Sequence, residues 1–142
     1  MLDSAQEVLQ LQSRGDATAV EIATSAIDKI EATQESINAF THINRELVLS
    51  AAEVVDQKRR NGESLGPLAG VPVAVKDVLC TRDMPTTCSS NMLRNFRPPY
   101  DATVVEKLRK ADAIIVGKTN MDEFAMGAST ENSAFGNTRN PW

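Results

Sequence analysis

The chain has 142 residues, of which 42% are hydrophobic, and its formal net charge is -4. This length predicts one domain or part of one, and the hydrophobic share is large enough for a core, which argues against disorder. The acidic balance excludes the basic footprint of a nucleic-acid-binding domain, and no stretch approaches the roughly 18 apolar residues of a membrane span.

The cysteines and the N-terminus indicate a reducing compartment. Cys80 and Cys88 lack the spacing of zinc ligands, and the single histidine, His42, cannot complete a site, so we expect two free thiols and no bound metal. The opening residues are partly acidic and hold no long apolar run, unlike a signal or transit peptide. We therefore expect a soluble cytoplasmic protein that does not enter a membrane.

Residues 1–60 are predicted to form a helical segment. The stretches SAQE (4–7) and TAVE (18–21) fit a capping box, in which a hydroxyl and a glutamate satisfy the free amides of a first helical turn. Gly15 can end the first helix in a left-handed conformation. The second helix then carries an apolar stripe with helical spacing, formed by Val20, Ala23, Ile27 and Ile30.

A third helix is predicted from about Asn44 to Arg60, with a basic last turn that suits the helix dipole and Gly62 as the stop signal. Glycine and proline then accumulate in residues 61–70, which indicates a loop leading into new structure. His42 precedes the third helix, and we interpret it as a boundary residue rather than a catalyst.

Residues 66–142 are predicted to begin an α/β core. VPVAVKDVL (71–79) has the composition of a strand, and AIIVGKT (113–119) is the continuous apolar run typical of a buried parallel strand. A helix capped by Asp101 is expected between them, with a buried stripe of Val104, Val105 and Leu108. Strand, helix and strand make a right-handed βαβ unit, so the fold class is α/β.

The last stretch, GASTENSAFGNTRNPW (127–142), is polar and glycine-rich and has no apolar periodicity. A sheet of only two strands is too small to have both of its faces buried in a stable core. From this pattern we expect an incomplete sheet flanked by helices, and therefore the N-terminal part of a longer single domain.

Lys76 closes the first predicted strand and allows two interpretations. Its stem can lie on apolar surface with the amine in solvent. Alternatively the side chain is buried, which favours the neutral amine and would let it act as a base near neutral pH. The ends of strands in α/β sheets are where functional sites gather. Asp77 should point to the opposite side of the strand, so a pair between these two neighbours is not expected.

Several stretches resemble the amidase-signature family, most closely the A subunits of aspartyl/glutamyl-tRNA(Asn/Gln) amidotransferases. They are GPLAGVPVAVKD (66–77), TTCSS (86–90) and, most specifically, GKTNMDEFAMGASTENSAFG (117–136). The resemblance implies the amidase-signature fold and a Ser–cis-Ser–Lys triad whose lysine is Lys76. In the family both serines belong to a glycine/serine-rich signature that follows the segment matching Trp142.

The resemblance further implies a glutamine amidohydrolase that supplies ammonia for converting Glu-tRNA(Gln) and Asp-tRNA(Asn) to Gln-tRNA(Gln) and Asn-tRNA(Asn). The expected partners complete a heterotrimer: one is a tRNA-binding, amidating kinase and the other is a small stabilising protein. ATP and Mg²⁺ are expected on the kinase, and no cofactor is expected on this chain. One alternative is part of a stand-alone amidase for small amides; another is a truncated product without catalysis.

The resemblance also assigns weaker roles. The segment Met126, Gly127, Ala128 and Ser129 would lie beside the substrate, although a polar loop that closes the sheet edge fits it equally well. Thr86, Thr87, Cys88 and Ser89 are interpreted as structural, with nothing nearby to activate the thiol. Asp112 stands where the family commonly has glycine, so a left-handed backbone at a modest cost in stability is expected there.

If the two serines are absent from the polypeptide, residues 1–142 alone should release no ammonia from glutamine. An enzyme-coupled ammonia assay checks this, with Lys76→Ala as the control. Turnover by the unsubstituted chain above that of the control would contradict the expectation.

Overall fold

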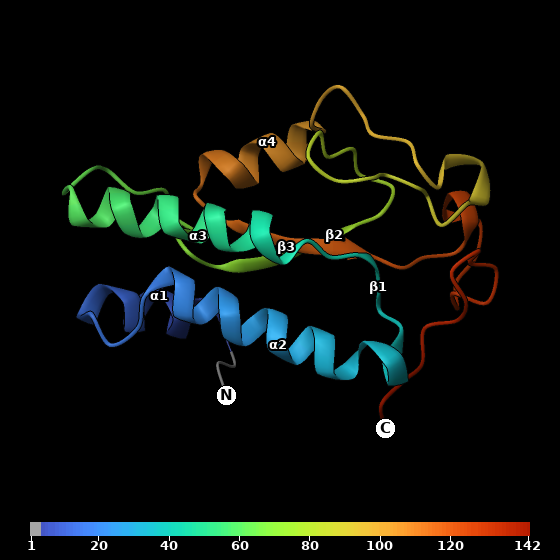
Figure 1. Cartoon of the computed structure of the whole chain (residues 1–142), viewed down its shortest axis with the longest axis horizontal. Helices are drawn as coiled ribbons and strands as arrows, with labels where there is room; N and C mark the ends of the chain where they lie inside the picture. Colours follow the sequence, from blue (N-terminus) through green and yellow to red (C-terminus); the bar gives the residue numbers. More distant parts are fainter. Residues whose placement is uncertain (1–3) are drawn as a thin grey trace.

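The computed structural model describes residues 4–142 as helices around a three-stranded sheet (Figure 1). The elements are α1 (Ala5–Arg14), α2 (Ala19–Ile37), β1 (Phe40–His42), α3 (Arg45–Arg60), β2 (Pro72–Lys76), η1 (Asn91–Leu93), α4 (Thr103–Lys110), β3 (Ile114–Thr119) and η2 (Glu123–Ala125). The strand order is β1-β3-β2, with β2 parallel and β1 antiparallel to the central strand β3. Within residues 4–142, no helix is long and apolar enough to cross a membrane.

The helix boundaries in the first 60 residues follow the capping signals. Ser4 and Thr18 both accept a backbone N–H of the first turn, and Glu21 completes the capping box of α2 by accepting the Thr18 N–H. Gly15 ends α1 with a φ of 77°. Asn44 caps α3, whose last turn is basic as predicted. Local sequence therefore determines these three helices almost completely.

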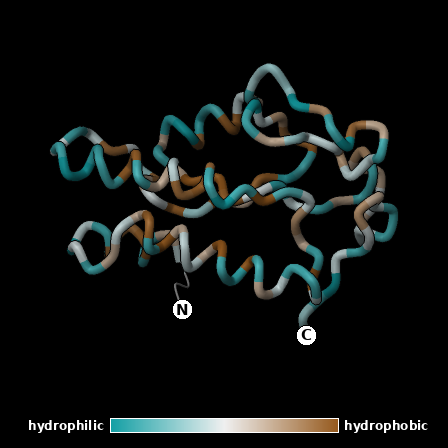
Figure 2. Tube along the Cα trace, viewed as in Figure 1, coloured by the Kyte–Doolittle hydropathy of each residue, from teal (hydrophilic) through white to brown (hydrophobic). Residues whose placement is uncertain are grey.

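The sheet separates two apolar layers. On one face, α2 and α3 pack on β3 through a core that includes Ile27, Val48 and Ile114. On the other face, α4 covers β2 and β3 through Val105 and Ile115. Figure 2 shows hydrophobic residues along the central strands and on the helices around them, while many of the loops are hydrophilic. The βαβ unit predicted from the sequence is confirmed.

The parallel pairing of β2 with β3 contains a bulge. Val73 pairs with Ile115, but the next residue, Ala74, pairs with Gly117, so β3 carries one additional residue at this point. Beyond the bulge Val75 pairs with Lys118. A bulge shifts the alternation of side chains between the two faces, and it decides which residues meet at the carboxyl end of the two strands.

Two expectations for the C-terminal half are wrong. Asp101 does not cap α4: the N-cap is Ala102, without a side-chain cap, because the Asp101 carboxylate accepts the N–H and Nε of Arg82 and pairs with Arg109. Val104, expected in the buried stripe of this helix, is exposed. After β3 the chain forms the short turn η2, and β1 had no sequence prediction because three residues leave no periodicity.

Asp112 has the expected left-handed backbone, with a φ of 59°. Its carboxylate also accepts the Lys58 ammonium at 2.7 Å and the Gly66 N–H at 2.6 Å. Gly66 must be glycine here, because a Cβ atom would lie 2.4 Å from the carbonyl carbon of Ala111. These contacts oppose the expected conformational cost and fix the loop that leads into β2.

Asp112→Asn should destabilise the protein by about 1 kcal/mol at neutral pH, because asparagine tolerates the left-handed backbone but loses the charge. Burial raises the pKa of Asp112, but Lys58 and Gly66 outweigh it and the net pKa is lowered. Its contribution to stability is therefore present above about pH 4 and is lost as the pH falls through the lowered pKa. Urea unfolding at several pH values measures this; a difference that persists in acid would contradict it.

Candidate functional site

Lys76 is the last residue of β2, at the carboxyl end of the parallel pair. Its backbone is fixed on both sides: it pairs with Thr119 of β3, and its carbonyl accepts the N–H of Leu79 in the following turn. The side chain is exposed, so within residues 4–142 its amine lies in solvent while its backbone is held in place. The position agrees with the sequence prediction, whereas burial of Lys76 is not observed.

Asp77 follows Lys76 and is completely buried. Its backbone N–H donates to the Thr119 carbonyl at 3.1 Å, and its carbonyl accepts the Cys88 N–H at 3.1 Å. The carboxylate accepts the N–H of Thr87 at 3.2 Å and forms a second, short hydrogen bond with the Thr87 hydroxyl. Asp77 thus connects the end of β2 to the loop at residues 86–90.

Lys118 of β3 is the buried lysine of this site, with none of its side chain exposed. Its ammonium lies 3.2 Å from Asp77 Oδ1 and donates to Thr86 Oγ1 at 2.7 Å and to the Pro85 carbonyl at 3.1 Å. Burial lowers the pKa of Lys118, while the charge of Asp77 and the hydrogen bond to it oppose that shift. Three partners use all three donors of an ammonium, so Lys118 has no free position from which to act as a base.

The loop at residues 86–90 has an unusual backbone. Cys88 and Ser89 both have a φ of 51°, a left-handed conformation that non-glycine residues rarely adopt. It is maintained by contacts on both sides: the Cys88 carbonyl accepts the Phe124 N–H at 2.9 Å, and the Ser89 hydroxyl accepts the Met121 N–H at 3.2 Å. The interpretation of this loop as structural agrees with its burial and bonding.

Asp122 organises the segment predicted to lie beside a substrate. Its carboxylate accepts the N–H groups of Ser129, Thr130 and Asn132 at 3.2, 2.9 and 3.1 Å. The bonds from Thr130 and Asn132 lower the pKa of Asp122 the most. Gly127 packs closely against the same group, since a Cβ atom there would lie 2.4 Å from Asp122 Cγ. One carboxylate therefore determines the shape of residues 126–132.

The structure brings the predicted residues to one end of the sheet. Lys76 ends β2, and the segment of Met126, Gly127, Ala128 and Ser129 follows β3 at the same end and is exposed (Figure 1). The connection between them runs through Asp77, Cys88 and Phe124 by backbone hydrogen bonds. Asp77, Lys118 and Asp122 had no predicted role; the one available signal was a lysine inside an apolar run, AIIVGKT.

The other titratable groups of interest do not change this picture. Burial raises the pKa of the Cys88 thiol, which agrees with the prediction that it is not an activated nucleophile. Burial likewise lowers the pKa of His42, a half-buried residue of β1. Neither group has the exposed, activated character of a nucleophile or general base.

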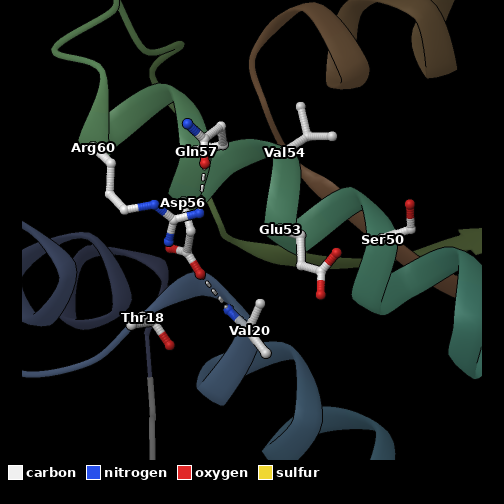
Figure 3. A pocket seen from close by; sticks show the side chains of 8 residues that line it. All are labelled: Thr18, Val20, Ser50, Glu53, Val54, Asp56, Gln57 and Arg60. Atoms are coloured by element: carbon white, nitrogen blue, oxygen red, sulfur yellow. Dashed lines mark hydrogen bonds between the residues drawn. The ribbon is translucent and has the colours of Figure 1, made fainter.

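An open depression lies between the start of α2 and the second half of α3 (Figure 3). Asp56 is its most constrained member: the buried carboxylate of α3 accepts the N–H groups of Ala19 and Val20 at 2.8 and 3.1 Å and so caps α2. The helix segments that border it, the start of α2 and the second half of α3, lie toward the opposite end of the molecule from the end of β2 (Figure 1). The carboxylate of Asp56 is therefore already engaged in holding α2 and α3 together.

Comparison with known proteins gives a consistent result. The family model described as Amidase matches residues 21–142. The A subunit of glutamyl-tRNA(Gln) amidotransferase from Rhodopirellula baltica is 63% identical over 142 residues, which are 100% of this chain and 28% of that protein. The chain thus spans about 28% of the length of this curated relative.

Solved structures agree with this comparison. The A subunit of glutamyl-tRNA(Gln) amidotransferase from Thermotoga maritima is 36% identical with a TM-score of 0.71, over 87% of this chain and 25% of that chain. A bacterial aryl acylamidase, described as an amidase-signature enzyme, has a TM-score of 0.92 at 28% identity, over 99% of this chain and 29% of that one.

Asp122→Asn should loosen residues 126–132, because an amide offers one acceptor oxygen where the carboxylate offers two. Protection of the Ser129, Thr130 and Asn132 amides from hydrogen exchange should fall, while Asp16→Asn, the same change at an exposed position, leaves it unchanged. The pKa of Asp122 is lowered, so its hold on the loop is present at neutral pH and lost as the pH falls through that pKa. Wild type and variant should therefore converge in acid; equal protection at neutral pH would refute the role.

Proposed function

The chain belongs to the Amidase family, and we propose that within it residues 1–142 supply the lysine base of a glutamine-hydrolysing subunit of a tRNA-dependent amidotransferase. The supporting observation is the placement of Lys76. It ends a parallel strand with an exposed amine on a backbone that is fixed before and after it. A side chain in this position can reach a group brought to the carboxyl edge of the sheet.

In the proposed reaction the neutral amine of Lys76 takes the proton of a bridging serine, which activates the nucleophilic serine. The nucleophile attacks the side-chain amide carbon of glutamine, and the carbon–nitrogen bond breaks. The leaving nitrogen takes a proton back from Lys76 through the bridging serine and departs as ammonia, and a glutamyl ester remains on the nucleophilic serine. Water then hydrolyses the ester to glutamate and restores the hydroxyl. The proposal requires burial of Lys76 by the parts of the enzyme that carry the serines, since burial favours the neutral amine.

The exposed segment Met126–Ser129 is the proposed substrate contact. It lies at the same end of the sheet as Lys76. Its shape is determined by the Asp122 carboxylate, which lies outside the segment. Because the loop is already ordered, its backbone groups can form hydrogen bonds with an amide substrate at little cost in conformational entropy. We assign no catalytic role to its side chains.

The proposed partners are an amidating kinase that binds the tRNA and a small stabilising protein, which together with the glutaminase form a heterotrimer. The kinase uses ATP and Mg²⁺ to activate the glutamyl or aspartyl group for attack by the ammonia. Identities of 52–63% to proteins named as A subunits of glutamyl-tRNA(Gln) amidotransferase favour this proposal. We place the complex in the cytoplasm.

The second candidate function is a stand-alone amidase. Its support is the likeness to a peptide amidase, with a TM-score of 0.88 at 31% identity, because such an enzyme would use the same lysine. The two functions differ in their response to a partner. A tRNA-binding kinase should stimulate glutamine hydrolysis by an amidotransferase and should leave the rate of a stand-alone amidase unchanged.

Both proposals can be tested in a hybrid enzyme. Residues 1–142 would replace the matching segment of the Rhodopirellula baltica protein, and the hybrid would be assembled with the partner proteins from the same organism. An identity of 63% over this segment supports correct folding of the hybrid. Activity is measured with glutamine and, separately, with ammonia as the nitrogen donor.

Lys76→Met in the hybrid enzyme should lower glutamine-dependent amidation by about 10²–10⁴-fold, the usual contribution of a general base. Ammonia-dependent amidation should remain, because free ammonia bypasses the hydrolysis step. Lys110→Met, at an exposed position at the end of α4, is the matched control and should change neither rate. If both activities fell together in Lys76→Met, Lys76 would be structural.

A further inference from the structure

The buried pair of Asp77 and Lys118 is a feature that the proposed reaction does not use. Both side chains are completely buried and lie 3.2 Å apart. A buried ion pair adds little net stability over well-packed apolar groups, because removing two charges from water offsets their attraction. Stability alone therefore does not account for the pair, and its location beside Lys76 suggests a geometric role.

The pair fixes the backbone that carries Lys76. Successive residues of a strand point to opposite faces, so Asp77 points into the protein on the face opposite to Lys76. Its carboxylate is held by Lys118 from the neighbouring strand and by Thr87 from the loop. With Asp77 anchored in this way, the Cα–Cβ bond of Lys76 has little freedom to change direction.

The pair also holds the loop at residues 86–90 in place. Lys118 donates to Thr86 Oγ1 and to the Pro85 carbonyl, and the Asp77 carboxylate binds both the backbone N–H and the hydroxyl of Thr87. These contacts supply the restraint that the left-handed residues after Thr87 require. The end of β2, the end of β3 and this loop therefore meet at one buried ammonium.

We propose that Lys118 is a positioning residue for Lys76: through Asp77 it fixes the direction in which the catalytic amine projects from the end of β2. This inference rests on the proposed function, in which Lys76 is the base. Lys118 is completely buried, and its three hydrogen-bond partners leave it no free donor for a substrate.

The test uses the hybrid enzyme with Lys118→Met, which keeps the approximate length of the side chain and removes its charge. The kcat for glutamine hydrolysis per folded molecule should fall roughly 10²-fold, as expected for a displaced catalytic group. The KM for glutamine should change little, because Asp122 holds the segment at residues 126–132 independently. The folded fraction is determined by circular dichroism well below each melting temperature.

The double variant Asp77→Asn with Lys118→Met separates positioning from stability. Lys118→Met alone leaves a buried carboxylate unpaired, which is strongly destabilising, whereas the double variant has no buried charge at this point. The melting temperature should therefore recover in the double variant, while kcat per folded molecule stays low because the side-chain link between Lys118 and Asp77 is missing. Asp112→Asn, at the other end of β3, serves as the control with normal kcat.

The outcomes distinguish this inference from the proposed function. If kcat returns to the wild-type value together with the melting temperature, Lys118 acts only through folding and the inference is overturned. A normal kcat in a folded Lys118→Met enzyme overturns it equally. Glutamine hydrolysis that survives Lys76→Met instead refutes the proposed function, whatever the Lys118 variants show.

Discussion

The buried ion pair between Asp77 and Lys118 is the interaction on which the carboxyl end of this sheet depends. An ammonium without partners would be very unfavourable inside the protein, so its neighbours must supply oxygen atoms at defined positions. Asp77, Thr86 and Pro85 supply them, and each comes from a segment that follows β2. The polypeptide after the strand is consequently ordered around one charge, although residues 81–100 contain only a short 3-10 turn.

A second carboxylate plays a similar part at the opposite end of β3. The Asp112 carboxylate accepts hydrogen bonds from Lys58 of α3 and from the Gly66 N–H of the loop before β2, just as the Asp77 carboxylate binds several groups at the carboxyl end. The two sites differ in burial: the Lys58 side chain is 34% exposed, whereas Lys118 is 0% exposed. Water can replace a partner at the first site but not at the second, so geometry is enforced more strictly beside Lys76.

The sequence predicts the parts of this fold that local chemistry determines. Capping residues and apolar periodicity locate α1, α2 and α3, and continuous apolar runs locate β2 and β3. Contacts between distant residues decide the rest. Asp101 is of a residue type that often caps helices, but its carboxylate binds Arg82 and Arg109 instead. Lys76 is exposed at the expected strand end, whereas the buried lysine is Lys118, because burial of a charge depends on partners contributed by other segments.

The bulge between β2 and β3 limits which changes in length this pair of strands can tolerate. With the additional residue, Lys118 lies beside Val75, on the face shared with Asp77. In an unbroken register continued from Val73 and Ile115, Lys118 would instead lie directly beside Lys76, and two ammonium groups would face each other across adjacent strands. An insertion in β3 ahead of Lys118 that kept the bulge would move Lys118 beside Lys76 and convert an attractive pair into a repulsive one, whereas deletion of the additional residue, Val116, would leave Lys118 beside Val75. Lengthening of this strand should therefore disrupt the ion pair, while loss of the bulge residue keeps the pair in register.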